Sequence, residues 1–189
     1  MPTALASGDQ IVFHYKGNVT PPKDYDQWKE LIHKLVSHWV DRYSLDEVRQ
    51  WFFEVWNEPN EASFWTGTQA DYFKLYHYTV EAIKSIDPAL QVGGPATAQN
   101  AWIEDFLDFC EQHHLPVDFV STHHYPTDAF GAPEDDIETQ LAKSQRSILR
   151  QQAQDAHRWA RGKLLFYTEW NSSSGPRDIY MMRLTRLLL

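Results

Sequence analysis

The sequence predicts an α/β fold in which about five parallel strands alternate with helices that pack on the outside of the sheet. Short apolar segments of strand length are followed, in turn, by longer segments whose apolar residues recur at helical spacing. This alternation is typical of a parallel sheet with right-handed crossover connections. The 189 residues are 42% hydrophobic, which is enough for one packed core, and no low-complexity segment or long linker divides them.

The first half of the chain predicts two strands and two helices. Residues 11–15 form an apolar segment of strand length that ends at a Lys-Gly-Asn turn. Residues 26–43 carry apolar side chains at helical spacing, which indicates an amphipathic helix. Residues 51–56 are apolar on both faces, which suits a parallel strand that is covered on both sides. Thr68 and Asp71 can cap the helix that follows this strand.

The second half continues the same alternation. Residues 90–95 predict a short strand with a glycine turn, and helical spacing resumes over residues 102–115. Residues 117–123 predict the fourth strand. Apolar spacing over residues 137–161 indicates a long helix with a polar break, and residues 164–169 predict a fifth strand.

The composition argues against several classes of partner. The net charge is −9 and no basic run occurs, so we expect no nucleic-acid partner. The eight Trp and nine Tyr fit sugar binding, because flat rings stack on pyranose faces, but they also fit an ordinary core. Cys110 is the single cysteine, which excludes an internal disulfide. The N-terminus lacks a signal pattern and no apolar run approaches membrane-spanning length, so we expect a soluble, cytoplasmic chain without a membrane partner.

The strand over residues 51–56 turns polar at once, with Asn57, Glu58 and Pro59. Proline disfavours the helical region for the residue before it, so we expect Glu58 to be extended. Its position is the carboxyl end of an inner strand, where chemistry occurs in α/β barrels. The alternative is a solvated glutamate at a strand exit.

The strand over residues 164–169 repeats this pattern, because Glu169 follows an apolar run and precedes Trp170 and Asn171. Two carboxylates at two strand exits are what glycoside hydrolysis requires. One is protonated and donates a proton to the leaving oxygen, and the other is ionised. The alternative of two unrelated surface acids is disfavoured because both strands end in the same unusual way. We therefore expect the two carboxyl carbons to lie within about 10 Å of each other.

A third strand exit carries His123, His124 and Tyr125. Adjacent strand residues point to opposite faces, so the two histidines are poorly placed to bind one metal, and we expect no metal and no cofactor. One histidine and Tyr125 lie on the same side of the strand. From periodicity alone, two interpretations stay open: this pair faces the reacting groups, or it is hydrogen-bonded within the barrel wall.

Several ordered motifs together resemble glycoside hydrolase family 39, the β-xylosidase group of the (β/α)₈ glycosidases. They are residues 53–60, 167–171, 15–22, 91–95 and 118–123. The resemblance implies that residues 1–178 are a partial (β/α)₈ TIM barrel, with strands that correspond to family strands three to seven. A complete barrel of this type needs roughly 250 residues, so we expect strands one, two and eight to be absent from this chain.

The resemblance also implies roles for individual residues. Glu58 matches the general acid/base of the family and Glu169 matches its nucleophile. Asn57 matches the amide that binds the hydroxyl beside the reacting carbon, and His123 and Tyr125 match residues of the sugar-binding subsite. The implied activity is the hydrolysis of β-xylosidic bonds in xylo-oligosaccharides or aryl xylosides, with retention through a covalent glycosyl-enzyme and without a cofactor.

Two alternatives to this activity remain. The family also contains α-L-iduronidases, so an iduronidase or another retaining glycosidase of the superfamily is the enzymatic alternative. The other is a truncated, inactive sugar-binding remnant that self-associates through open barrel edges, since unpaired strand edges invite pairing with another chain.

Residues 179–189 depart from the family pattern, which continues with a His-Asp-aromatic-alanine run. Reading from the third base of the Tyr180 codon restores a compatible run, so we expect a non-family tail produced by a frameshift. The alternative is a natural short helix with one apolar face.

Overall fold

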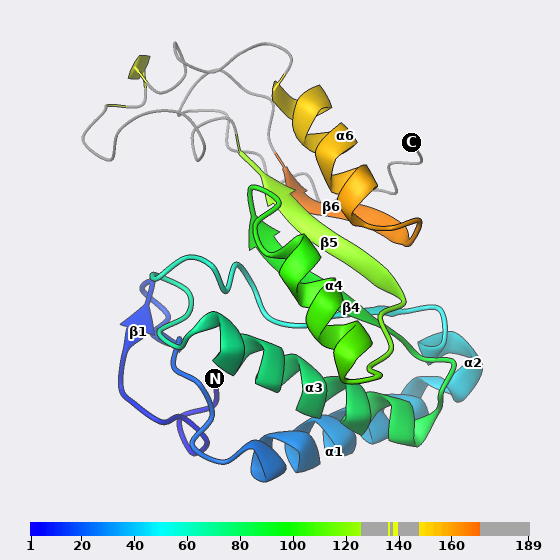
Figure 1. The fold of residues 1–189 in the computed structure, drawn as a ribbon. Helices are drawn as coiled ribbons and strands as arrows, with labels where there is room; N and C mark the ends of the chain where they lie inside the picture. Colours follow the sequence, from blue (N-terminus) through cyan, green and yellow to red (C-terminus); the bar gives the residue numbers. More distant parts are fainter. Residues whose placement is uncertain (126–135, 137, 140–147, 171–189) are drawn as a thin grey trace.

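The computed structural model describes residues 1–125, 136, 138–139 and 148–170. At its centre, four parallel strands form a curled sheet in the order β3-β4-β5-β6 (Figure 1). The strands are β3 (Phe52–Glu54), β4 (Gln91–Ala98), β5 (Phe119–His124) and β6 (Leu164–Trp170). Each connection in this sheet contains a helix, and the helices lie on its outer side (Figure 1). The predicted α/β fold, a partial TIM barrel, is therefore confirmed.

The described helices are α1 (Tyr25–Tyr43), α2 (Leu45–Val48), α3 (Gln69–Ile86), α4 (Ile103–Gln112) and α6 (Ile148–Trp159). The predicted cap of α3 is present, because Thr68 and Asp71 form a reciprocal capping box. The long helix expected over residues 137–161 is observed as α6 and at residues 138–139. The helix ends at Trp159 and residues 160–161 form a turn, whereas residues 137 and 140–147 lie outside the described part of the chain, as does the tail over residues 179–189.

Among the described residues the parallel sheet has four strands rather than the expected five. Residues 11–15 do not join it: β1 (Ile11–Val12) pairs antiparallel with β2 (Gly17–Asn18) in a small hairpin. Positive φ angles of 60° at Phe13 and 55° at Lys16 reverse the chain between the two strands. Ile11, Phe13 and Tyr15 are 54–65% exposed. The apolar run therefore belongs to a surface hairpin. Among the described strands, β1 and β2 pair only with each other.

The expectation that residues 51–56 are buried on both faces is wrong on the inner face. Val55 is buried toward the helices, whereas Phe52 is 46% exposed. The Phe52 ring packs edge-on against Phe119 and Phe166, with centroids 5.4 and 5.0 Å apart. Gly93 permits this inner layer, because a Cβ there would lie 2.2 Å from the carbonyl oxygen of Phe119.

The main core lies between the sheet and the helices, and polar groups of buried aromatic residues pin these layers together. The indole of Trp28 on α1 donates to Thr79 Oγ1 on α3 at 2.8 Å. The hydroxyl of Tyr72 on α3 donates to the carbonyl oxygen of Val55 at 3.0 Å, directly after β3. Burial raises the pKa of the nearby Cys110 thiol to about 12, which makes it unreactive at neutral pH. These layers hold the carboxyl edge of the sheet in place.

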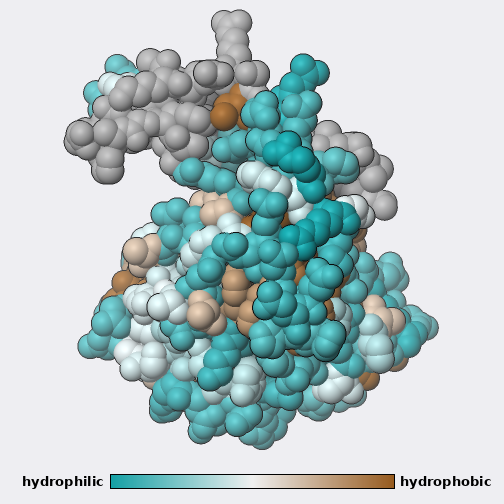
Figure 2. Space-filling view, viewed as in Figure 1, coloured by the Kyte–Doolittle hydropathy of each residue, from teal (hydrophilic) through white to brown (hydrophobic). Residues whose placement is uncertain are grey.

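The outer surface of the helices is largely hydrophilic in the view of Figure 2. In the part of the chain that the structure describes, no helix combines the length and the apolar character that crossing a membrane requires.

Candidate active site

Glu58 lies at the carboxyl end of β3, in a turn that is tied to β4. Its backbone N–H donates to the carbonyl oxygen of Ala96 at 2.8 Å. Asn60 forms two bonds with Ala98: Oδ1 accepts from the backbone N–H at 2.9 Å, and Nδ2 donates to the carbonyl oxygen at 3.4 Å. Hydrogen bonds to β4 therefore hold the turn that carries Glu58 in place.

The expectation that Glu58 is extended is wrong. Its φ is +42°, and that of Trp56 is +70°, so both residues occupy the left-handed region. Such a conformation costs of order 1–3 kcal/mol for a non-glycine residue and persists only where surrounding contacts enforce it. Here the hydrogen bonds to β4 outweigh the preference that Pro59 imposes. They turn the carboxylate of Glu58 into the barrel, where its side chain is 10% exposed.

Glu169 reaches the same interior through a β-bulge in β6. Thr122 pairs with Tyr167 and His123 pairs with Glu169, so Thr168 is an extra residue between them. The bulge allows two consecutive side chains to serve the inner face. Thr168 Oγ1 donates to Glu54 Oε1 at 3.0 Å. With strict alternation, either Thr168 or Glu169 would face the helices instead.

His123 lies between the carboxylates. Its side chain is 1% exposed, and Nδ1 lies 2.8 Å from Glu58 Oε1 and 3.7 Å from Glu169 Oε2. One carboxylate oxygen of Glu58, one of Glu169 and one ring nitrogen of His123 all lie within 4.8 Å of one another. With carbon–oxygen bonds of about 1.25 Å, the two carboxyl carbons are at most about 7.3 Å apart. The expected approach of the two carboxylates is therefore found.

The charge state of His123 follows from its neighbours. Burial lowers its pKa, but the carboxylates of Glu54, Glu58 and Glu169 outweigh burial and raise the pKa to about 9. At neutral pH the ring is therefore an imidazolium. The atoms of Glu58, His123 and Glu169 are close enough for a metal ion, but an imidazolium has no free lone pair to offer one.

The structure gathers four of the five predicted site residues around the carboxylate pair. The Tyr125 hydroxyl donates to Glu169 Oε2 at 2.9 Å, next to His123. The fifth, Asn57, is half-buried, and its amide forms no hydrogen bond with any other described residue. His124 points the other way, toward Gln152 on α6, and burial lowers its pKa. His123 and Tyr125 therefore both contact the glutamates, and whether they serve the reaction stays a prediction.

Sequence reasoning missed Glu54. It lies on β3, and its Oε1 is 3.7 Å from Nε2 of His123. Its side chain is 23% exposed, and it shares the inner face of the strand with Phe52. The available signal was a charged residue in the middle of a segment otherwise made of Trp, Phe and Val, since such a position is expensive for an unpaired charge.

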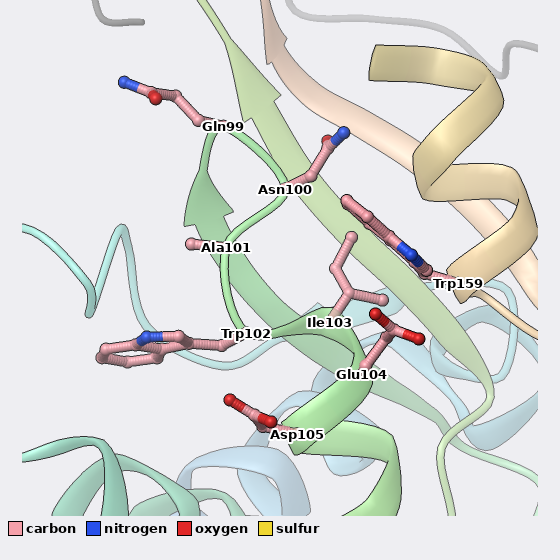
Figure 3. Close-up of a pocket in the computed structure, with 8 residues that line it drawn as sticks. All are labelled: Gln99, Asn100, Ala101, Trp102, Ile103, Glu104, Asp105 and Trp159. Atoms are coloured by element: carbon pink, nitrogen blue, oxygen red, sulfur yellow. The ribbon is translucent and has the colours of Figure 1, made fainter. Parts of the chain in front are cut away.

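A pocket of about 290 Å³ lies on the opposite side of the sheet, between the start of α4 and Trp159 of α6 (Figure 3). Asn100 in its lining bonds to the outward-facing residues of the sheet and to α6. It accepts from Tyr167 Oη at 3.0 Å, its backbone N–H donates to Thr122 Oγ1 at 3.0 Å, and its amide donates to the carbonyl oxygen of Gln152 at 2.8 Å. These polar groups hold α6 against the sheet, and the carboxylate pair lies on the inner face.

Comparison with known sequences agrees with this geometry. The sequence profile "Glycosyl hydrolases family 39" matches residues 1–186. A protein named Beta-xylosidase from Caldicellulosiruptor saccharolyticus is 52% identical over 181 residues, which are 95% of this chain and 37% of that protein. Another Beta-xylosidase, from Geobacillus stearothermophilus, is 59% identical over 122 residues, 63% of this chain and 24% of that protein. The matches span 24–37% of the length of these relatives.

More distant relatives include the human Alpha-L-iduronidase, 32% identical over 96 residues that cover 48% of this chain and 15% of that protein. Among solved structures, a monomeric beta-xylosidase from Caulobacter crescentus CB15 superposes with a TM-score of 0.80 at 39% identity, over 93% of this chain and 37% of that one. The GH39 enzyme from Xanthomonas axonopodis pv. citri gives 0.81 at 37% identity, over 93% of this chain and 36% of that one. Since the family profile covers nearly the whole chain and the fold agrees, the chain belongs to glycosyl hydrolases family 39.

Proposed function

We propose that this chain carries the catalytic glutamates of a retaining glycosidase that hydrolyses β-xylosidic bonds. The observation that carries the proposal is the pair of carboxylates at the carboxyl edge of the sheet, at most about 7.3 Å apart between carboxyl carbons. Retaining enzymes place this pair about 5–5.5 Å apart and inverting enzymes about 6.5–9.5 Å. The bound excludes most of the inverting range, and the names of the two relatives from Caldicellulosiruptor saccharolyticus and Geobacillus stearothermophilus, both Beta-xylosidase, support the sugar.

In the first chemical step, Glu169 attacks the anomeric carbon and forms an ester, while Glu58 donates its proton to the departing glycosidic oxygen. In the second step, Glu58 removes a proton from water, which attacks the anomeric carbon and releases Glu169. Tyr125 supports this division of work, because its hydroxyl occupies Oε2 of Glu169 and leaves Oε1 for the sugar. Asn57 is available to bind a sugar hydroxyl.

The charge of the site favours a neutral sugar over a uronic acid. In the described part of the chain, His123 is the one cationic partner of Glu54, Glu58 and Glu169. A uronate would bring a further negative charge to a site where carboxylates already outnumber the imidazolium. Like charges in one poorly solvated site repel each other strongly. This argues for a xyloside and against an iduronide.

A panel of 4-nitrophenyl glycosides tests the proposal. It includes β-xyloside, β-glucoside, α-L-iduronide and α-L-rhamnoside. We would assay the 189-residue chain and a chimera in which it replaces the matching segment of the Caldicellulosiruptor saccharolyticus relative. We expect β-xyloside to give the highest kcat/KM and the first-formed xylose to be the β-anomer by NMR. Preference for the iduronide, or release of the α-anomer, would overturn the proposal.

The isolated chain has a second candidate function, sugar binding without turnover. Among the described strands, β3 pairs with β4 alone and β6 with β5 alone, so each has an edge without a strand partner. We propose that such edges cause self-association of the 189-residue chain. Light scattering after size exclusion should show mass rising with concentration, and calorimetry should show xylose binding while turnover stays near background. A monomer with full catalytic efficiency would contradict this candidate.

A further inference from the structure

The mechanism above leaves one half-buried carboxylate in the barrel interior unused. Glu54 enters the barrel interior from β3, four residues before Glu58. Two polar contacts with described residues position it: Thr168 Oγ1 donates to its Oε1 at 3.0 Å, and Nε2 of His123 lies 3.7 Å from the same oxygen. The first contact fixes the carboxylate against the bulge of β6, and the second directs it at the histidine.

His123 consequently faces a carboxylate at each ring nitrogen. Nδ1 lies 2.8 Å from Glu58 Oε1, and Nε2 faces Glu54 on the other side. A neutral imidazole carries a proton on one nitrogen only and no charge, so with the proton on Nδ1 it would serve Glu58 and leave Glu54 only the hydroxyl of Thr168 among the described donors. The imidazolium donates from Nδ1 to Glu58 and places its positive charge 3.7 Å from Glu54 Oε1, which agrees with the rise of its pKa to about 9.

We propose that Glu54 is a positioning residue for the acid/base: it holds His123 oriented and doubly protonated, so that Nδ1–H always donates to Oε1 of Glu58. This inference rests on the proposed function and deepens it. Because Oε1 is occupied as an acceptor, the reacting proton of Glu58 resides on Oε2. The same imidazolium stabilises the carboxylate that Glu58 becomes after it has donated that proton.

The other titratable groups described near His123 have hydrogen-bond partners of their own. Glu169 of β6 lies 3.7 Å from Nδ1 and is itself bonded to Tyr125. Tyr72 of α3 interacts with Glu54 through its charge, and its pKa is raised well above the usual range by burial first and by Glu54 second, so it stays neutral. His124, on the same strand, faces Gln152. Removal of the charge of Glu54 is therefore felt at His123.

Nuclear magnetic resonance of the 189-residue chain labelled with ¹⁵N-histidine tests this directly. The His123 resonances are assigned by their loss in His123→Gln. In the unaltered chain we expect both ring nitrogens to be protonated at neutral pH, with a titration midpoint of about 9. Glu54→Gln keeps the shape and removes the charge, and should lower the midpoint by about one unit or more.

Three further variants make the result specific. Glu54→Asp keeps the charge, so its midpoint should lie above that of Glu54→Gln. Glu104→Gln is the matched control, because Glu104 is exposed at the start of α4 and its loss should leave the midpoint unchanged. Thr168→Val removes the donor that fixes Glu54 and should give a smaller drop, which keeps a test available if Glu54→Gln does not fold.

A midpoint in Glu54→Gln that equals that of the unaltered chain would overturn the inference. The pH dependence of kcat/KM for 4-nitrophenyl β-xyloside in the chimera adds a second readout. Its alkaline limb should move to lower pH in Glu54→Gln and return toward the original in Glu54→Asp, which a purely structural loss would not produce. A shifted midpoint without any xylosidase activity would keep the positioning network and refute the proposed function, whereas normal activity with an unmoved midpoint would do the reverse.

Discussion

The exits of β3 and β6 look alike in sequence and deliver their glutamates in different ways. Glu58 stands in a left-handed turn that is tied to β4, with its side chain 10% exposed. Glu169 follows a bulge in β6, is bonded to a tyrosine, and its side chain is 34% exposed. The more buried carboxyl, that of Glu58, lies 2.8 Å from Nδ1 of His123, and the carboxyl of Glu169 lies 3.7 Å from the same nitrogen. Similar sequence motifs therefore acquire different surroundings in the folded chain.

The largest expected effect comes from Glu169→Ala. Loss of the nucleophile should abolish turnover of 4-nitrophenyl β-xyloside in the chimera, because no glycosyl-enzyme forms. Added azide should then attack the sugar directly and give the α-xylosyl azide, which NMR identifies. Normal turnover by Glu169→Ala would show that Glu169 is not the nucleophile.

Glu58→Ala should behave differently, which sharpens the contrast between the two exits. Without the proton donor, substrates with poor leaving groups should lose about 10²–10⁴-fold in kcat/KM. Activated aryl xylosides should still form the glycosyl-enzyme, since their leaving groups need little protonation. Azide should accelerate turnover and give the β-xylosyl azide. An equal loss for good and poor leaving groups would contradict a role as acid.

Tyr125→Phe tests the polar support of Glu169 with a smaller change. The variant loses one hydrogen bond to a carboxylate, which is worth about 1.5–3 kcal/mol, so kcat should fall roughly 10–100-fold. Tyr78→Phe on α3 is a control that removes a hydroxyl elsewhere. If kcat stays unchanged in Tyr125→Phe, the contact with Glu169 does not contribute to the reaction.

Asn60→Ala tests the support of the other exit. Its side chain forms two hydrogen bonds with Ala98, and their loss should destabilise the turn of Glu58 by about 1–2 kcal/mol. Urea unfolding should show this decrease with an unchanged slope. We expect the turnover of 4-nitrophenyl β-xyloside in the chimera to fall even under conditions where the variant stays folded, because this turn positions Glu58. A variant with unaltered activity and stability would show that the Ala96 hydrogen bond is sufficient.

The pH dependence of stability gives the smallest signal. Burial lowers the pKa of His123 and its three carboxylate neighbours raise it to about 9, above the ordinary value of 6.5. A raised pKa stabilises the folded state fully below about pH 6.5, and this contribution is lost as the pH rises through about 9. The thermal midpoint of unfolding should therefore decrease as the pH is raised from about 6.5 to about 9, and this decrease should be smaller in Glu54→Gln. Equal slopes in both proteins would contradict the assignment.

Much of the fold was predictable from the chain alone, because the strands and helices of the sheet follow local periodicity. The Thr68 cap and the strands that carry the two glutamates were found in this way. The hairpin at residues 11–18 was not, since an apolar run indicates a strand but not its partner. The expected tail at residues 179–189 lies outside the described residues and stays a prediction.

Pattern and chemistry in the sequence by themselves determined the fold class and the residue types at the strand exits. The carboxyl ends of parallel strands meet at one edge, so Glu58 and Glu169 were expected to meet there. Only the tertiary structure decided how they meet. The left-handed turn at Glu58 and the bulge at Thr168 each involve a hydrogen bond between segments far apart in the chain, and Glu54 approaches His123 to 3.7 Å across the same interior. Local propensity carries no information about such partners, and for Glu58 the bond to β4 overrode it.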